Sequence, residues 1–118
     1  MENLSVQDVA ALKREILSSL HCALPGIVES FDAETGTAAI RPVVKRRDGT
    51  ALPLLRDVPV YLPEAREISP GDFCLLIFAD CDIDAWLETG EESVPLSARQ
   101  HDLSDAFAFV GFTFRDRQ

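Results

Sequence analysis

The segment Phe73-Cys74-Leu75-Leu76-Ile77-Phe78-Ala79 decides the fold, because its seven apolar residues are not interrupted by a polar one. The turn signal Pro70-Gly71-Asp72 precedes it, and Asp80-Cys81-Asp82-Ile83-Asp84 follows it. Proline fixes φ and glycine tolerates positive φ, so the first boundary suits a sharp change of direction. A short apolar run between such boundaries is typical of a strand buried on both faces. We therefore predict a central strand here, followed by Trp86, the only tryptophan, as a large apolar contribution to the core.

The composition is that of an ordinary globular domain. The chain has 118 residues, 47% hydrophobic and 26% charged, which suits one domain. No apolar run approaches the ~20 residues of a membrane-spanning helix, and the first residues lack the basic start of a signal peptide. The three cysteines have no zinc or redox spacing, so we expect synthesis and folding in the cytoplasm, with Cys74 as an apolar core residue.

The charge argues against a nucleic-acid partner. Twenty acidic residues against eleven basic ones give a net charge of −9, whereas a phosphate backbone is bound by a basic face. The one basic cluster, Lys45-Arg46-Arg47 with Arg41 nearby, is too short to reverse that balance. We interpret it as a solvated strand end that leads into a turn.

The first 22 residues are predicted to form a helical arm, with a β-domain over residues 23–118. The helix should run from Ser5 to about Cys22, and Ser5 with Asp8 resembles a capping box. Apolar residues recur at spacings of three and four, at Val9, Leu12, Ile16 and Leu20. Two interpretations stay open: the helix packs on its own β-domain, or it is an arm that packs on a neighbouring subunit.

Strand signals replace the helical pattern after Leu24-Pro25-Gly26, which we expect to end the helix. Residues 27–32 alternate, which places Ile27, Glu29 and Phe31 on one face, and residues 33–36 form a turn before a second strand over 37–44. Residues 47–50 are another turn signal. Residues 52–55 and 58–62 are short extended pieces broken by prolines, and residues 63–70 are a polar connection.

The last third predicts a loop, one helical turn and a final strand. Residues 87–99 have the composition of a loop. His101-Asp102-Leu103-Ser104-Asp105-Ala106-Phe107 predicts a helical turn with Asp102 as its cap, in which Leu103 and Phe107 face the core together. A strand over residues 108–114 follows. One helix and about five closely spaced strands predict a mainly β fold, a small five-stranded OB-fold-type barrel.

Two patterns have the residue types of a chemical site. Acids at 80, 82, 84, 88 and 91 approach the spacing of a twelve-residue calcium loop, but position six, normally glycine, is Ala85, and a strand precedes the loop. A calcium-binding module over Asp80–Glu91 is therefore an alternative only. His101, Asp102 and Ser104 have the residue types of a hydrolase triad, but on one local turn they cannot converge. We expect no catalytic residue, no metal and no cofactor.

Four groups of residues carry a resemblance to a known family. They are Leu24-Pro25-Gly26-Ile27-Val28 with Phe31-Asp32; Asp57-Val58-Pro59-Val60; Gly71-Asp72 leading to Ile83-Asp84-Ala85-Trp86 and Gly90; and the segment His101 to Phe107. Together they resemble the N-terminal domain of phage baseplate spike proteins, over about Ala23 to Phe112. The family motif thus comprises Pro25, Gly26, Gly71, Asp72, Asp84, Trp86, His101, Asp102, Leu103, Ser104, Asp105 and Phe107.

The resemblance implies an OB-fold barrel that forms a homotrimer on the tail axis and joins the spike to the baseplate hub or tail tube, in the virion. It gives the motif residues a structural role: Trp86 fills the barrel end against Phe107, and the turn from His101 to Asp105 seals it. Relatives continue into a membrane-piercing needle, whereas no needle repeat occurs up to Gln118. Either a longer parent chain carries the needle, or this is a short form for attachment alone, and direct membrane contact is not expected of these residues. The alternative from the fold alone is an OB-fold module for single-stranded nucleic acid or saccharide.

Overall fold

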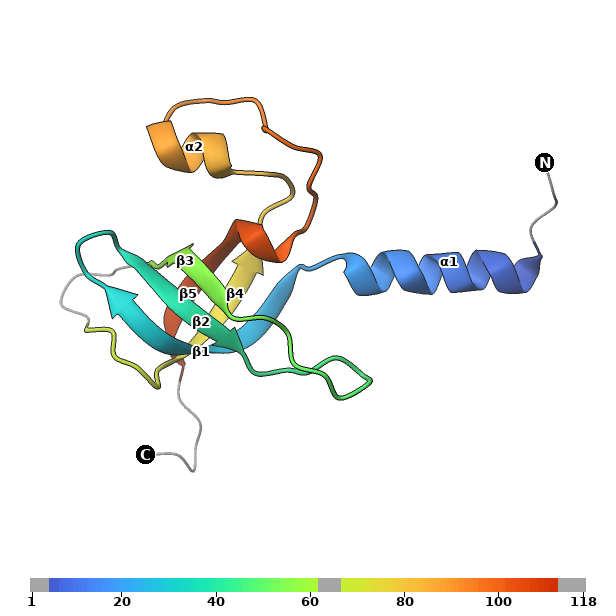
Figure 1. Cartoon of the computed structure of the whole chain (residues 1–118), viewed down its shortest axis with the longest axis horizontal. Coiled ribbons are helices and arrows are strands. Elements are labelled where there is room, and N and C mark those ends of the chain that lie inside the picture. Colours follow the sequence, from blue (N-terminus) through green and yellow to red (C-terminus); the bar gives the residue numbers. More distant parts are fainter. Residues whose placement is uncertain (1–4, 62–66, 113–118) are drawn as a thin grey trace.

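The computed structural model describes residues 5–61 and 67–112, and it is mainly β, as predicted (Figure 1). The elements in chain order are α1 (Val6–Ser19), β1 (Ala23–Asp32), β2 (Thr37–Pro42), β3 (Leu55–Pro59), β4 (Phe73–Phe78), α2 (Asp84–Thr89), the 3-10 turn η1 (Leu103–Asp105) and β5 (Ala106–Phe112). Parts of three predicted segments lie outside the described residues: the end of the extended piece at residue 62, residues 63–66 of the polar connection, and the end of the last strand at residues 113–114.

The five strands form one antiparallel sheet in the order β3-β2-β1-β4-β5. The sheet curls, so that its two edges approach each other just after β3. There Val60 forms a parallel bridge with Ala108, and the Tyr61 amide donates to the Ala108 carbonyl at 2.9 Å. This contact gives the curled half-barrel that the OB-type prediction requires.

The core lies inside the curl and takes alternate residues from every strand. Its buried members are Val28, Ala38, Ile40, Leu55, Val58, Val60, Cys74, Leu76, Phe78, Ala106 and Ala108. Gly26 faces the same interior, where a Cβ atom would lie 2.7 Å from Ile40 Cγ2 and 3.2 Å from Leu76 Cδ1. Glycine is therefore needed here for close packing.

Strand β1 corrects two predictions. Residues 24–26 do not end a helix; they pair with Leu76, Leu75 and Cys74 of β4, because the sheet already begins at Ala23. A β-bulge between Val28 and Ser30 then interrupts the alternation. Phe31 consequently packs against the core together with Val28, instead of sharing the outward face of Ile27 and Glu29.

Strand β4 is buried on one face only, so the prediction of two buried faces is wrong for the single chain. Cys74, Leu76 and Phe78 are in the core, whereas Leu75 is half-buried and Ile77 is 40% exposed. The barrel interior can cover only one side of a strand, and no other layer of the described chain covers the opposite side. An apolar outer surface is the result.

Helix α1 is shorter than predicted and stands away from the barrel (Figure 1). The predicted capping box is confirmed: the Asp8 amide donates to Ser5 Oγ and the Ser5 amide donates to Asp8 Oδ2, both at 3.1 Å. The helix ends at Ser19 because the next residues join the sheet: the Phe78 amide donates to the Cys22 carbonyl at 3.1 Å. None of its residues is buried, so the first of the two open interpretations, packing on its own β-domain, is not adopted.

The helices of the described part of the chain include none long and apolar enough to cross a bilayer. The sheet begins at Ala23, where the predicted β-domain begins. That the arm and the barrel are separate domains stays a prediction.

Candidate functional site

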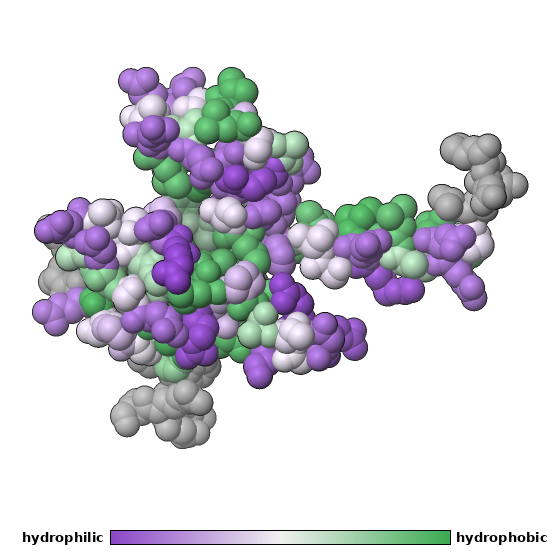
Figure 2. Space-filling view, in the orientation of Figure 1, coloured by the Kyte–Doolittle hydropathy of each residue, from purple (hydrophilic) through white to green (hydrophobic). Residues whose placement is uncertain are grey.

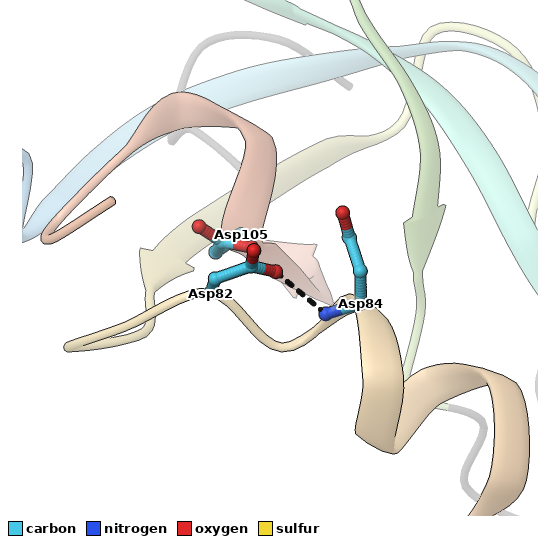
Figure 3. Close-up of side chains that lie close together, drawn as sticks. All are labelled: Asp82, Asp84 and Asp105. Atoms are coloured by element: carbon cyan, nitrogen blue, oxygen red, sulfur yellow. Dashed lines mark hydrogen bonds between the residues drawn. The ribbon is translucent and has the colours of Figure 1, made fainter. Parts of the chain in front are cut away.

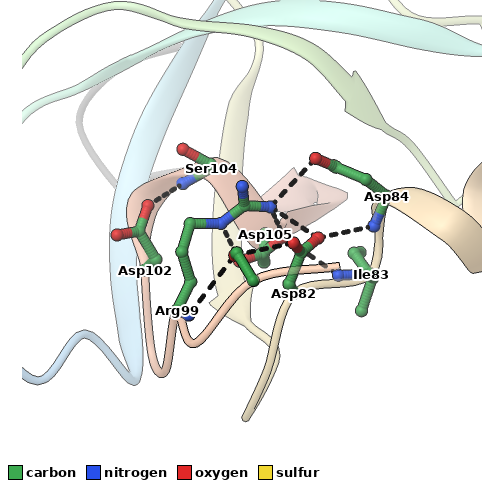
Figure 4. A network of polar contacts seen from close by, with 8 residues as sticks. Asp82, Ile83, Asp84, Arg99, Asp102, Ser104 and Asp105 are labelled. Atoms are coloured by element: carbon green, nitrogen blue, oxygen red, sulfur yellow. Dashed lines mark hydrogen bonds and ion pairs between the residues drawn. The ribbon is translucent and has the colours of Figure 1, made fainter. Parts of the chain in front are cut away.

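Four charged residues converge where the β4–α2 connection meets the turn before β5. Asp82 comes from the connection, Asp84 is the first residue of α2, Asp105 comes from η1, and Arg99 comes from the long loop between α2 and η1 (Figure 4). Arg99 Nη2 lies 2.8 Å from Asp82 Oδ1, 3.1 Å from Asp84 Oδ2 and 2.8 Å from Asp105 Oδ1. We call these four residues the arginine clamp, because one guanidinium holds three segments together.

Asp105 is the deepest member of the clamp and is fully buried. Its Oδ2 accepts a hydrogen bond from Arg99 Nε at 3.1 Å, and its Oδ1 accepts one from the Ile83 amide at 3.2 Å. Its own backbone carbonyl accepts from the Ala79 amide at 2.8 Å. The contacts with Ile83 and Ala79 tie η1 to the connection after β4, and the contact with Arg99 ties it to the long loop, so Asp105 closes this end of the barrel.

Asp82, whose side chain is only 1% exposed, anchors the opposite side of the clamp. Its Oδ1 accepts from the Asp84 amide at 2.9 Å, and its Oδ2 accepts from Ser97 Oγ at 2.7 Å. These two hydrogen bonds, together with the Arg99 charge, hold the pKa of the Asp82 carboxyl below its ordinary value of 3.8. Hydrogen bonds to Asp105 and then Asp84 raise the pKa of the Arg99 guanidinium, which therefore carries its charge at neutral pH.

The three carboxylates also have the geometry of a cation site, since one oxygen from each lies within 4.8 Å of the others (Figure 3). The Arg99 guanidinium, however, contacts all three. The positive charge that the carboxylates require is therefore already supplied by the chain. The donor set does not fit a metal as long as Arg99 occupies this position.

The calcium-loop spacing does not produce a loop. Helix α2 takes up Asp84–Thr89, so residues five to ten of the twelve-residue stretch are helical and do not form a calcium-binding loop. Gly90, with φ of 74°, ends α2 in the left-handed conformation. Asp82 and Asp84 turn toward Arg99, and not toward a shared centre with Glu88 and Glu91.

The turn from His101 to Asp105 forms as predicted. Asp102 caps η1 by accepting from the Ser104 amide at 2.9 Å, a bond that lowers the pKa of its carboxyl. His101 adopts a positive φ of 49°, and its Nε2 lies 3.5 Å from Asp80 Oδ1. Leu103 packs against the core. Phe107 belongs to β5 instead and points outward, so the prediction that both face the core is wrong for Phe107.

Outward-facing side chains of β4 and β5 make a second feature, an apolar patch on the outside of the barrel. Leu75 pairs with Phe109 and Ile77 pairs with Phe107, and we call these four residues the outer apolar face. Ile77 is 40% and Phe109 is 38% exposed. Tyr61 extends the patch, with its ring centroid 5.8 Å from that of Phe109. These side chains form a contiguous, partly exposed apolar surface on the outside of the barrel.

Trp86 borders this face and does not fill the barrel end. Its ring centroid lies 6.2 Å from that of Phe107, so the predicted packing of these two rings is confirmed. The indole is nevertheless 45% exposed, because α2 sits outside the barrel. The core is complete without it: Ile40, Leu76 and Val28 are fully buried.

The remaining motif residues shape the barrel. Gly71 has φ of 95°, and its amide donates to the Val28 carbonyl at 2.8 Å. Asp72 accepts from the Ser69 amide at 2.9 Å, which fixes the same turn. The Pro25 carbonyl accepts from the Val43 amide at 3.2 Å. These contacts position β1 between β2 and β4.

Sequence reasoning missed Arg99, Asp82 and Ser97 as members of the site. Sequence reasoning places Arg99 at the end of the loop over residues 87–99, and it names Asp82 only as a candidate calcium ligand or as one of a row of solvated acids. Charge pairing is the signal that could have found the clamp. Between Arg66 and Arg115 the sequence has one arginine and no lysine, and that arginine, Arg99, stands among many acidic residues. A lone base among acids is a candidate partner for whichever acid is buried.

Comparison with known proteins assigns the chain to a family. Residues 24–111 match the family described as the phage protein Gp138 N-terminal domain. No curated protein matches the sequence. The matched range includes the arginine clamp and the outer apolar face, leaves α1 outside, and agrees with the range of about Ala23 to Phe112 over which the sequence resembles phage spike proteins. The chain therefore belongs to the family of the phage protein Gp138 N-terminal domain, and it is a structural protein of a phage.

Proposed function

We propose that this domain is the attachment domain of the central membrane-puncturing spike in a contractile tail baseplate, where it joins the spike to the hub or tail tube. In this role it acts as a homotrimer in the virion and has no catalytic activity. The membrane is pierced by other residues of the spike, so the domain makes no direct contact with lipid or nucleic acid.

The observation that carries the proposal is the outer apolar face, which lies on a curled sheet whose two edges meet at Val60 and Ala108. Ile77 and Phe109 are large apolar side chains more than a third exposed, and they lie on neighbouring strands whose opposite sides form the core. A barrel that worked alone would place polar residues there. Association with other protein subunits removes this surface from water and gives the domain its use as a connector.

The arginine clamp supports the same role. It locks the connection after β4 to the turn before β5 through charged groups that are largely removed from water. A connector that transmits force along a tail benefits from such rigidity, since a buried network has one arrangement in which all its groups are satisfied.

The mass of the isolated domain in solution tests the proposal. Sedimentation equilibrium should give three times the 13.0 kDa of one chain, and co-expression with the hub and tube proteins of the same phage should yield a complex. A monomer that binds neither protein would contradict both the trimer and the attachment role.

One observation favours the alternative, a module for single strands. Tyr61 and Phe109 form an exposed ring pair on an OB-type barrel, which is a stacking platform for bases. Two of the basic residues are held by other groups: Arg41 pairs with Glu29 at 2.7 Å, and Arg46 donates to the Ala51 carbonyl at 2.9 Å. Salt-dependent retention on single-stranded DNA, lost in Tyr61→Ala, would establish this alternative.

A further inference from the structure

The chain leaves a second apolar surface uncovered, along one side of α1 (Figure 2). It is formed by Val6, Val9, Leu12, Ile16, Leu17 and Leu20, each of them between 38% and 87% exposed. An isolated helix of fourteen residues is marginal in water, because it has no tertiary packing to support it. Something must therefore cover this stripe when the protein is assembled.

The helix cannot cover the outer apolar face of its own chain. The His21 amide donates to the His101 carbonyl at 3.0 Å, and the Cys22 carbonyl accepts from Phe78, so the chain is fixed to the barrel directly after the helix. Only Leu20 separates Ser19, the last helical residue, from this fixed point. A reversal of direction between packed elements normally takes two to five residues with turn chemistry, which a single leucine does not supply.

Pairing of α1 with further copies of α1 is also disfavoured. Fourteen residues give about two heptads, whereas a coiled-coil seam is sustained over three or four. The stripe is also broader than a two-position seam, because Val6 and Leu17 widen it beyond Val9 and Ile16. A broad stripe suits a partner surface wider than one helix, such as the side chains of two adjacent strands.

The dimensions and charges of the outer apolar face match those of the stripe. A helix of fourteen residues spans ~21 Å, and strands of six and seven residues span ~20–24 Å. The helix carries Lys13 within its stripe, next to Val6 and Val9, and Arg14 at the edge of the stripe. Acids lie at the end of the face: Asp80 follows β4 with a 91% exposed side chain, and Glu88 lies in α2, two residues after Trp86.

We propose that α1 of one copy of this chain lies along the outer apolar face of a second copy. The contact is heterologous, with the helix of each copy on the sheet of the next, so a closed ring leaves neither surface exposed. The inference rests on the proposed association of identical copies, but it specifies the surfaces and does not depend on the number of copies.

Cross-linking between two differently marked chains tests this contact. In a background where Cys22 and Cys81 are replaced by serine, one chain carries Ile16→Cys and the other carries Phe109→Cys, and the two are co-expressed and treated with a short bis-maleimide. Both native side chains are substantially exposed, so neither substitution should prevent folding. Glu15→Cys on the polar side of α1 and Glu34→Cys in the β1–β2 turn serve as matched controls.

The expected result is a covalent dimer of the two different chains, several-fold more abundant than with either control. A dimer formed by Ile16→Cys chains alone would overturn the inference in favour of helix pairing. An internal link in a chain that carries both cysteines, without any mixed dimer, would overturn it in favour of packing on the same chain. No link at all would show that another protein covers α1.

The outcome separates this inference from the proposed trimer. A sedimentation mass of three copies without a mixed cross-link refutes the helix exchange and leaves the trimer standing. A mixed cross-link at any other mass supports the exchange and refutes the trimer.

Discussion

Replacing Asp105 with asparagine tests whether burial determines the strength of the arginine clamp. Asp105→Asn keeps the side-chain shape but removes the charge, and it turns an amide NH₂ group toward the N–H groups of Arg99, which lie 2.8 and 3.1 Å from the carboxylate. Because Asp105 is fully buried, breaking this pair should cost about 3–5 kcal/mol. That is a large part of the ~5–15 kcal/mol that stabilises a typical domain.

Asp84→Asn is the matched control, since Asp84 contacts the same Arg99 nitrogen at 3.1 Å but its side chain is 53% exposed. An exposed pair contributes ~1 kcal/mol or less. Urea unfolding at one fixed protein concentration, followed by the fluorescence of Trp86, should show a midpoint lower by ~1–3 M for Asp105→Asn and nearly unchanged for Asp84→Asn. Equal midpoints for the two variants would refute the argument from burial.

Three further predictions follow from the barrel and the clamp. Gly26→Ala should lower the free energy of unfolding by about 1–3 kcal/mol, because the new Cβ atom would lie 2.7 Å from a methyl group of Ile40. Urea unfolding measures this change, and a midpoint equal to that of the parent protein would show that the site has room for a methyl group. The carboxyl pKa of Asp82 is lowered in the folded state, so its contribution to the free energy of unfolding is present above the ordinary pKa of 3.8 and is lost as the pH falls below it. The free energy of unfolding of Asp82→Asn, measured between neutral and acid pH, should therefore depend less on pH than that of the parent, and an equal dependence would contradict this. Burial raises the pKa of the Cys74 thiol to about 11, so this thiol should not react with iodoacetamide at pH 8, whereas the exposed Cys22 should. Mass spectrometry should find Cys22 modified and Cys74 intact, and equal labelling of the two would contradict the burial of Cys74.

The parts of the fold that sequence predicts well are those with short-range signals. The capping box at Ser5 and Asp8 and the cap at Asp102 are contacts between residues two or three apart, so the spacing alone defines them. The β1–β2 hairpin is similar, because the turn ending at Gly36 joins neighbouring strands. The number of strands, and hence the barrel type, follows from such signals added along the chain.

The parts that sequence misses depend on contacts between distant residues. Ser97 and Arg99 reach Asp82 across fifteen and seventeen residues, and no spacing rule predicts that. The run at β4 could not reveal which of its two apolar faces the same chain covers, since alternation is absent when both faces are apolar. Trp86 was placed in the core by size, but the core is filled by smaller residues and the indole is left at the surface.

The arginine clamp closes the long loop between α2 and η1, which makes this loop a suitable place for inserted sequence. The residues between Thr89 and Ser97 are held at both ends, by α2 and by the bonds of Ser97 and Arg99 to Asp82, while Val94 and Leu96 are 82% and 71% exposed. New sequence inserted between these ends would lengthen a surface loop whose closure is already secured, at an entropic cost that grows only slowly with length. A fluorescent or affinity tag placed at residue 94 would therefore report on a working particle while leaving the barrel, the outer apolar face and the arm unchanged.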